Sequence, residues 1–554
     1  MTFRGWTAKI RGMSKKALWI LIGIIAVGAL VRVWGLSSMD LFHDEGLYAF
    51  RSIGYFDFID NESQTQPVQW FQNTQLPWWT RLSFHDHPPL FFLVQHFFFA
   101  LLGDGRWVAR LPSLLAGLGT IVLAYSIFAR IFQKENVGLV AAAILAVSNI
   151  HVWISRSILI EPLLIFLLFL NWYLFLRALE DRRWWRWWGI ALGLVFLTKY
   201  TGFFVVPAYG IYLLIFRRSV FRERSFYIGC ALAFLFFSPV IIYNFYLYRT
   251  VGHFDLQFAY LFRQPTPEWQ VSLGKFQEPF KMLLPNLFAM YSLPYLFVVI
   301  IGLVLSCVGW FKNKTSSFVL GWLFLIMSTL ILVAVGSAFR FLSLYLIPFL
   351  FFSVLVYAWF EARKKSSAPL LWVVVIVLAY ESFFTIQGVF VEYPDFGIAK
   401  LDAYFDEVLG NRASLATPTS LNPHLNAVMG SYYKTLPKND KFTLLVFDEN
   451  LSLTPRLWLF DRRLYYHGIP AMTAGNFKNF LKSRGAAYFH GYDIYFVKAS
   501  ADTSLNPLLF VPDAQDFEHF LNQELNLRPD KIIEGHGRLP GPLQPMLYVY
   551  HFAL

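Results

Sequence analysis

The sequence predicts an α-helical polytopic membrane protein with a separate C-terminal α/β domain. The chain of 554 residues is 56% hydrophobic and 19% aromatic, and its mean hydropathy is +0.48. Soluble domains average about 45–50% apolar residues, so this composition favours a membrane protein. Long apolar runs fill the first 390 residues, whereas the remaining segment mixes apolar and polar residues.

The apolar runs define the expected membrane-spanning helices. A helix that spans the hydrocarbon core needs about 20 mostly apolar residues. Eleven runs approach or reach this length: 17–36, 111–132, 137–155, 157–177, 186–201, 202–217, 226–247, 288–311, 318–336, 340–360 and 369–390. Another run, 88–102, has only about 15 residues, is short for a span and starts at a Pro-Pro pair. Because further spans follow 17–36, we expect it to be a retained helix rather than a cleaved signal peptide.

The distribution of basic residues determines the expected topology. If 88–102 does not span, the loops on the N-terminal side of the membrane carry the basic clusters: Arg130 and Lys134; Arg177, Arg182, Arg183 and Arg186; Arg217, Arg218, Arg222 and Arg224; Lys312 and Lys314; Arg363, Lys364 and Lys365. Basic residues favour the cytoplasmic side. We therefore expect a cytoplasmic N-terminus, a location in the cell (plasma or inner) membrane, and an interfacial juxtamembrane helix at 88–102.

This topology sets the expected domains. Residues 1–390 form the transmembrane domain, with extracytoplasmic loops at 37–110 and 248–287, and residues 391–554 form a soluble extracytoplasmic α/β domain. Strand-like runs at 444–448, 492–497 and 546–553 and helix-like runs at 475–484 and 514–525 support the α/β assignment. The loop 248–287 is polar and Pro-rich, and is either a flexible cover over a site or an ordered connector.

Charge and cysteine content exclude some function classes. We attribute the net charge of +12 to basic residues that set the membrane topology and contact anionic lipid. Nucleic-acid binding is not expected, because no basic run forms a nucleic-acid motif. Cys230 and Cys307 both lie in apolar runs, so we expect buried free thiols and not a disulfide or metal pair.

Ionisable residues next to the outer ends of the spans are the candidate site. Charges within membrane helices are costly and usually functional, although an internal ion pair or, for the first acidic pair, a solvated loop would also explain them. The candidates are Asp44 and Glu45 in "FHDEGLYA", His85, Asp86 and His87 in "HDHPPL", Arg156 and Glu161 in "SRSILIEPLL", Lys199 in "FLTKY" and Arg340 in "FRFLSLYLIP".

This charge pattern fits group transfer from a lipid-linked phosphate. A carboxylate can remove the proton of an acceptor hydroxyl, cationic side chains can hold the departing phosphate oxygens, and apolar helices can hold the lipid tail.

Several motifs together resemble the GT-C superfamily of membrane glycosyltransferases, in the branch of protein O-mannosyltransferases and aminoarabinose-lipid A transferases. Besides the motifs already quoted, "HPPLFFL" (87–93), "RLPSLLAGLGTIVLAYSIFARIF" (110–132) and "GIALGLVFLTKYTGFFVVP" (189–207) are similar to that family in the same order. The resemblance covers roughly residues 15–390 and implies a GT-C fold with an inverting transfer from a polyprenyl-phosphate sugar.

The resemblance also implies residue roles. Asp44 would be the catalytic base and Glu45 its support, and Lys199, Arg340 and Arg156 would bind the donor phosphate. The residues expected to bind substrate are Glu161, Asp86 and His87. The donor's monophosphate ester requires no metal, although a divalent metal on His85 and His253, with His87 or Asp255, is a further possibility.

The expected partners are the donor lipid, membrane lipids and a glycan, lipid or protein acceptor, with no nucleic acid. Two other functions stay open. A transporter or flippase of lipid-linked sugars would spread polar residues across the midplane, whereas here the charges collect near one face. An oligosaccharide ligase of related fold usually carries a Trp-Trp-Asp motif in its soluble domain, which this sequence lacks.

Overall fold

The computed structural model describes residues 13–42, 44–58, 70, 76–264, 282–313, 316–336, 338–363, 367–420, 423–434, 436–500, 512–523 and 525–553. It divides into two compact units. The first, here called the helical unit, comprises Met1–Trp34, Trp78–Phe98 and Val108–Phe390. The second, here called the sheet unit, comprises Gly35–Pro77, Phe99–Trp107 and Val391–Leu554. The sheet unit thus includes parts of the first predicted outer loop.

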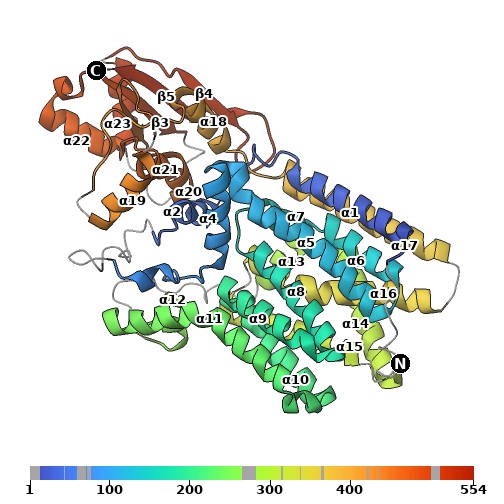
Figure 1. The fold of residues 1–554 in the computed structure, drawn as a ribbon. Coiled ribbons are helices and arrows are strands. Elements are labelled where there is room, and N and C mark those ends of the chain that lie inside the picture. Colours follow the sequence, from blue (N-terminus) through green and yellow to red (C-terminus); the bar gives the residue numbers. More distant parts are fainter. Residues whose placement is uncertain are drawn as a thin grey trace. The chain divides into compact units, whose positions relative to one another are not determined.

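The helical unit consists of helices that pack side by side (Figure 1). Helix α6 contacts α1, α16 and α17, and α9 contacts α8 and α11. The longer helices are α1 (Lys15–Val33), α4 (Leu90–Leu102), α5 (Arg106–Phe132), α6 (Glu135–Val147), α8 (Glu161–Glu180), α9 (Trp185–Thr198), α10 (Val205–Phe216), α11 (Arg224–Val251), α14 (Leu293–Asn313), α15 (Ser316–Val335), α16 (Leu346–Ala362) and α17 (Ser367–Ile386). Shorter helices are η2 (Trp78–Arg81), α7 (Asn149–Arg156), η3 (Arg182–Trp184), η4 (Tyr200–Phe204), η5 (Arg218–Arg222), α12 (Leu256–Leu261), α13 (Leu283–Met290), η8 (Phe339–Tyr345) and η9 (Gln387–Val391).

Every predicted span falls on helix, and the prediction of a multi-pass helical protein is confirmed. Among the described residues, seven helices are long and apolar enough to cross a membrane, or nine if each bent pair is one span. The bent pairs are α6 with α7, at 58°, and α13 with α14, at 110°. The runs 186–201 and 202–217 form shorter helices, because the chain is extended at Lys199 between them. Helix α4 is also shorter than a span.

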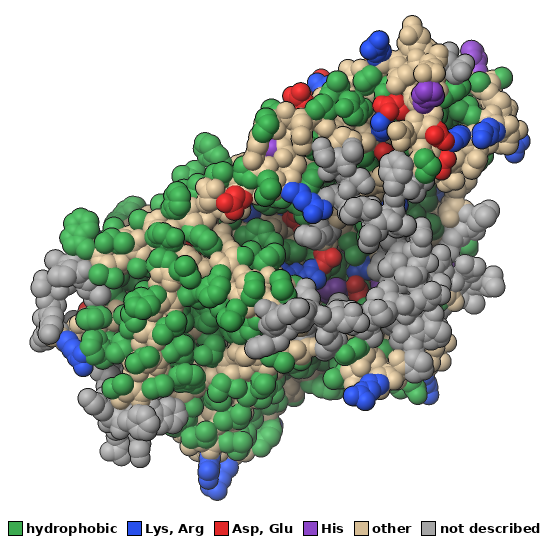
Figure 2. Space-filling view, turned by 180° about the vertical axis from the view of Figure 1, so that it is seen from behind, with side chains coloured by type: hydrophobic (Ala, Val, Ile, Leu, Met, Phe, Trp, Pro, Cys, Tyr) green, Lys and Arg blue, Asp and Glu red, His purple; other side chains and the backbone are tan. Residues whose placement is uncertain are grey.

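Apolar side chains cover much of the outer surface of the helical unit on the face drawn in Figure 2. Phe234, Leu235, Phe297 and Trp372 are each at least 60% exposed, as expected of helices that face lipid. Both cysteines are free as predicted, but Cys230 and Cys307 are exposed rather than buried. They lie on helices α11 and α14. In a soluble protein, other parts of the chain would cover the outer faces of these helices.

The loops predicted to be cytoplasmic are joined at one end of the helical unit. Ser14 donates to Glu135, and Arg130 pairs with Glu180. The same group of loops is connected further by the ion pairs Lys134–Glu361 and Arg182–Glu223. These contacts connect the ends of α1, α5, α6, α8, α11 and α16 that carry the basic clusters.

Glycine allows two close helix crossings in the helical unit. A Cβ atom on Gly189 of α9 would lie 2.0 Å from the carbonyl oxygen of Gly229 on α11, and one on Gly302 of α14 would lie 1.9 Å from that of Phe352 on α16. Small residues let membrane helices approach closely enough for extensive van der Waals contact.

The sheet unit contains the predicted α/β fold. Its described residues form a five-stranded sheet of order β2-β1-β3-β5-β4, in which β1 pairs in parallel with β2 and β3, while β5 is antiparallel to β3 and β4. The strands are β1 (Phe442–Phe447), β2 (Ala471–Thr473), β3 (Tyr492–Ala499), β4 (Lys531–Gly535) and β5 (Gln544–Ala553). Helices α22 (Ala474–Arg484) and α23 (Asp513–Gln523) pack on one core around Phe477, Phe496 and Phe517.

The other helices of the sheet unit are α2 (Asp44–Gly54), α18 (Ile398–Leu409), α19 (Pro423–Tyr433), α20 (Leu453–Arg456), η10 (Leu457–Asp461), α21 (Arg462–Tyr466) and η11 (Ala486–Phe489). The buried carboxylate of Asp40 fixes the start of α18: it accepts the backbone N–H groups of Phe396 and Ala399, both at 2.6 Å. Burial raises the pKa of Asp40 to about 6.

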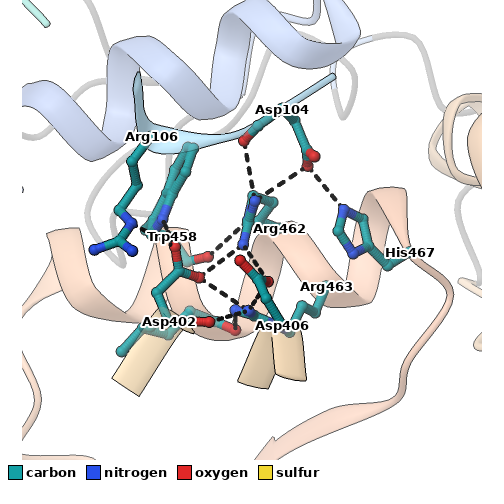
Figure 3. Close-up of polar contacts among 9 residues, drawn as sticks. Asp104, Arg106, Asp402, Asp406, Trp458, Arg462, Arg463 and His467 are labelled. Carbon is teal, nitrogen blue, oxygen red and sulfur yellow. Dashed lines mark hydrogen bonds and ion pairs between the residues drawn. The ribbon is translucent and has the colours of Figure 1, made fainter. Parts of the chain in front are cut away.

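A buried network of charged side chains joins α18, α21 and residues 99–107 within the sheet unit (Figure 3). The Asp402 carboxylate lies 2.7 Å from Arg462, 2.9 Å from Arg463 and 3.0 Å from Arg106. Asp104 lies 3.4 Å from Arg462 and 2.8 Å from His467. Burial opposes ionisation of Asp402, yet the two neighbouring α21 arginines lower its pKa to about 2. Acidic and basic groups thus offset one another's burial cost.

Replacing Asp402 by Asn should destabilise the sheet unit by about 3–5 kcal/mol, because buried guanidinium groups lose their shared carboxylate. Hydrogen exchange of peptides from α18 and α21 in the full chain measures the loss. Asp406→Asn is the matched control, since that carboxylate contacts the same arginines but its side chain is 58% exposed; it should cost less than about 1 kcal/mol. Equal effects of the two variants would contradict this role of Asp402.

Asp40 should make the stability of the sheet unit depend on pH. Its pKa of about 6 in the folded chain exceeds the value of about 3.9 expected when it is unfolded. The folded state therefore binds a proton that the unfolded state has lost, and the contribution of Asp40 to stability falls as pH rises through this interval. Thermal unfolding of wild type and Asp40→Asn from pH 4.5 to 7.5 measures this effect. As pH rises, wild type should lose stability relative to Asp40→Asn. A stability difference that stays constant with pH would contradict the assignment.

Candidate active site

Three of the predicted site residues meet inside the helical unit. The ammonium group of Lys199 lies 2.5 Å from Oε1 of Glu161, and Nε of Arg340 lies 3.9 Å from the same oxygen. Glu161 is 2% exposed and Lys199 is 7% exposed. Both cations also lie over the ring of Phe341, at 4.6 and 5.1 Å from its centroid. One carboxylate and two cations therefore meet here, with Glu161 and Lys199 buried and the Arg340 side chain 23% exposed.

Each of these side chains comes from an interruption of regular α-helix. Glu161 begins α8, with Pro162 in the first turn where the missing N–H costs nothing. Lys199 is the extended residue between α9 and η4, and Arg340 lies in η8, ahead of α16. Irregular backbone within a membrane protein requires polar partners or a cavity, and here it brings charged side chains together from separate helices.

Glu161 retains an unused acceptor. Its second carboxylate oxygen, Oε2, is buried and has no hydrogen-bond partner among the residues that the structure describes. A buried carboxylate oxygen without a donor is costly, and a hydroxyl group of a bound sugar could supply one. The expectation that Glu161 binds substrate stays a prediction.

A second polar cluster adjoins this site through the neighbour of Lys199. The Tyr200 hydroxyl donates to Oδ2 of Asp255 at 2.5 Å, and the Asn244 side chain donates to the same oxygen at 3.0 Å. The other oxygen of Asp255 caps the start of α12 by accepting the N–H of Phe258. Burial raises the pKa of the Asp255 carboxyl, while hydrogen bonds from Tyr200 and Asn244 act in the opposite direction. Asp255 therefore fixes the α11–α12 turn beside Lys199.

The motif "HDHPPL" packs against the same turn. The N–H of Leu256 donates to the carbonyl of His85 at 2.7 Å, and the Gln257 side chain donates to that of Asp86 at 3.3 Å. Nδ1 of His87 lies 3.0 Å from the Asp86 carboxylate. The expected substrate-binding residues Asp86 and His87 thus lie next to the α11–α12 turn, but nothing in this geometry tests their role.

The possible metal ligands remain a prediction. His85 is buried at the same turn, and Nδ1 of His253 lies 2.6 Å from the carbonyl oxygen of Phe254. That contact occupies one of the two ring nitrogens of His253.

Arg156 has clear structural contacts. Its guanidinium donates to the carbonyl oxygens of Val31, Arg32 and Trp34 at the end of α1, and it lies 4.4 Å from the ring centroid of Phe390. Cations at helix C-termini interact favourably with the helix dipole. The structure therefore explains the burial of Arg156 by the capping of α1, and its contact with donor phosphate stays a prediction.

Asp44 and Glu45 belong to the sheet unit, where they begin α2. Glu45 is buried and accepts the N–H of Phe42 at 2.9 Å, which is a helix-capping interaction. Asp44 is half-buried and accepts the Tyr48 hydroxyl at 3.3 Å. Their acidic character suits a helix N-terminus, and the expected catalytic role of both remains a prediction. Residues 265–281 of the predicted cover loop lie outside the described residues.

Sequence reasoning missed Glu381, a buried carboxylate within α17. It accepts the N–H of Asn149 at 3.2 Å and contacts the hydroxyl of Ser292. Asn149 starts α7 and Ser292 precedes α14, so Glu381 lies at the bends of both bent helix pairs. The signal was present as an ionisable residue inside the apolar run "LAYESFF".

Together these features define a multi-pass helical membrane protein whose fold is similar to that of GT-C membrane glycosyltransferases. Residues 86–243 match the family model described as dolichyl-phosphate-mannose-protein mannosyltransferase, and this match contains Arg156, Glu161 and Lys199. A putative mannosyltransferase of Bacillus subtilis, YycA, is 32% identical over 142 residues, which are 25% of this chain and 21% of the relative. The chain thus spans about a fifth of the length of the curated relatives it matches.

Two solved structures share the fold. ArnT from Cupriavidus metallidurans, in the apo state, is 16% identical, with a TM-score of 0.51 and coverage of 97% of this chain and 98% of that one. An Archaeoglobus fulgidus oligosaccharyltransferase solved with zinc and sulfate is 14% identical, with a TM-score of 0.51 and coverage of 87% and 68%. With the family match, these likenesses confirm the resemblance stated from the motifs.

Removing Glu161 should destabilise the helical unit more than removing Lys199. Glu161→Gln leaves two neighbouring cations without their shared carboxylate, whereas Lys199→Met leaves Arg340 beside Glu161. We expect a loss of about 3–5 kcal/mol for the first and less for the second, measured by thermal unfolding in detergent. The double variant Glu161→Met/Lys199→Met is the control, and it should recover part of the loss. The reverse order of the single variants would contradict this account.

Proposed function

We propose that this protein is a glycosyltransferase that moves a sugar from a polyprenyl-phosphate carrier to an acceptor hydroxyl or phosphate at the extracytoplasmic face of the membrane. The observation that carries the proposal is the contact of Lys199 and Arg340 with the buried carboxylate of Glu161. It lies in a helical unit whose outer surface suits lipid, and part of it falls within the family match. A lipid-linked phosphate needs both an apolar path for its tail and cations for its head.

The cations have a specific task in this reaction. As the bond between the anomeric carbon and the phosphate oxygen breaks, negative charge grows on the phosphate. Lys199 and Arg340 stabilise that charge, and their effect is large because water is largely excluded from a buried site. Glu161 holds the cations in place before the donor binds, and its free oxygen Oε2 accepts a hydroxyl group of the sugar.

Asp44 completes the reaction as general base. It takes the proton of the acceptor hydroxyl while the acceptor oxygen attacks the anomeric carbon on the face opposite the phosphate, which inverts that carbon. The phosphate leaves as the carrier lipid monophosphate. Glu45 supports Asp44 by fixing the first turn of α2 through Phe42.

Asp44→Asn should lower the rate of transfer by about 10²–10⁴-fold, because no carboxylate then takes the proton of the acceptor hydroxyl in the transition state. The measurement is transfer of labelled mannose from polyprenyl-phosphate mannose in proteoliposomes, with mass spectrometry of the envelope glycans of cells with and without the gene to identify the natural sugar and acceptor. Asp440→Asn, at an exposed carboxylate of the sheet unit, is the control. Activity of Asp44→Asn close to wild type would overturn the assignment of the base.

Lys199→Met should lower kcat/KM for the donor by about 10²–10³-fold, since it removes a group that binds the developing charge. Lys199→Arg should retain more activity because it restores the positive charge. The assay also separates transfer from transport: flux of labelled lipid-linked sugar without a covalent product would favour a flippase over the proposed enzyme.

A further inference from the structure

The turn between β4 and β5 of the sheet unit is an exposed apolar tip. Residues 538–543 read RLPGPL, and each of them is exposed. Leu539 is 76% exposed and Leu543 is 60% exposed. Pro540 and Pro542 have no N–H group and restrict the backbone. This tip therefore has fewer backbone N–H groups that require a hydrogen bond from water than an ordinary turn has.

The base of this tip is bound to the segment that follows the last span. Gly537 and Asp395 exchange backbone hydrogen bonds of 2.9 and 3.0 Å. The Lys400 ammonium group donates to the carbonyl of Glu534 on β4 and to the carboxylate of Asp395. The position of the tip is therefore fixed relative to residues 395–400.

That segment begins next to the membrane. The last candidate span is Trp372–Val391, so Asp395 lies four residues beyond it. Four residues reach at most about 14 Å, and the headgroup region of one leaflet is about 5–7 Å thick. Leu539 follows Gly537 by two residues, which adds at most about 7 Å. The base of the tip is thus attached to the chain close to the end of the last span.

A second connection holds the same segment near the membrane. Asp40 accepts the N–H groups of Phe396 and Ala399, and it lies seven residues after Val33, the end of α1. The ring of Phe42 contacts those of Tyr393 and Phe396. Both the first and the last span therefore lead within a few residues to the place where the tip is attached.

We propose that residues 538–543 form a membrane anchor whose occupant is the lipid bilayer that the helical unit spans. Leu539 and Leu543 enter the interfacial region beside the exits of the first and last spans, and Arg538 contacts the lipid phosphates. The anchor holds the sheet unit, with α2 and Asp44, at a constant height above the membrane surface. It adds an interaction surface to the proposed enzyme and does not depend on which reaction that enzyme performs.

An exposed aromatic residue away from the tip supplies the comparison position. Tyr488 in η11 is 56% exposed, and it lies near the start of β3, where Asp493 pairs with Ala553 at the far end of β5. The tip precedes Gln544 at the other end of β5. Ten strand residues separate the two ends by about 30 Å.

The test uses nitroxide spin labels on single cysteines in the full chain, reconstituted in vesicles of phosphatidylcholine and phosphatidylglycerol. Cys230 and Cys307 are first replaced by serine, and Leu539→Cys, Leu543→Cys and Tyr488→Cys are each labelled. Collision rates are measured with oxygen, which concentrates in the bilayer, and with a water-soluble nickel chelate. Retained transfer activity and a single gel-filtration peak establish that each labelled protein is folded.

We expect a ratio of oxygen to nickel collisions several-fold higher at positions 539 and 543 than at position 488, and a fall in that ratio when the same proteins are moved from vesicles to detergent-free amphipathic polymer. Equal ratios at all three positions would overturn the anchor. Protection from both reagents at 539 that depends on protein concentration would instead assign the tip to contact between copies of the chain, and would also overturn it.

Discussion

The structure of the helical unit depends on a carboxylate that is held away from water between two cations. An ionised group of this kind is tolerated only when its partners are close and correctly placed. Lys199 and Arg340 satisfy this need for Glu161, and they do so from segments where α9 and α16 are interrupted. The same contact that makes burial of these charges possible also connects α8, η4 and η8. A ligand phosphate that binds there competes for cations already positioned and desolvated, so little reorganisation is needed at the moment of reaction.

The bent helix pairs follow the same rule. Where α6 meets α7 and where α13 meets α14, the chain loses backbone hydrogen bonds that lipid cannot replace. Glu381 supplies acceptors at both bends, and Asn149 donates from one to the carbonyl of Met290 at the other. Arg156, at the end of α7, is in turn fixed on the carbonyls that end α1. Buried polar side chains thus satisfy the backbone where these helices break, and such breaks are also where function needs irregular backbone.

The sequence predicts the helices and the strands well because their signals are local. Apolar length gives the spans, and alternating apolar residues give β1, β3 and β5 to within a few residues. Local patterns do not reveal that residues 35–77 fold with the sheet unit, or that Arg462 and Arg463 share Asp402 across about 60 residues of chain. Similarly, the sequence identifies Glu161, Lys199 and Arg340 as ionisable residues near spans, but their pairing depends on three-dimensional packing. The contacts of Arg156 with the end of α1 are likewise long-range, and its role toward the donor phosphate stays a prediction.

The contact between Asp40 and the start of α18 also bears on how often the chain crosses the membrane. Seven residues connect Val33 to Asp40, and five connect Val391 to Phe396. Together the two segments reach at most about 43 Å, which exceeds the roughly 30 Å of the hydrocarbon core, so their length alone leaves the side open. Arg156, however, donates to the carbonyl oxygen of Trp34 at the end of the first span and lies 4.4 Å from the ring centroid of Phe390 at the end of the last span. Trp34 and Phe390 therefore lie close together within the helical unit, and we infer that the first and last spans leave the membrane on the same side. The number of crossings, counted from the first span to the last, must then be odd. The eleven predicted spans satisfy this condition, and α9 and α10 preserve it whether they cross as a pair or not at all. A twelfth crossing by α4 would break it, which supports an interfacial position for that helix.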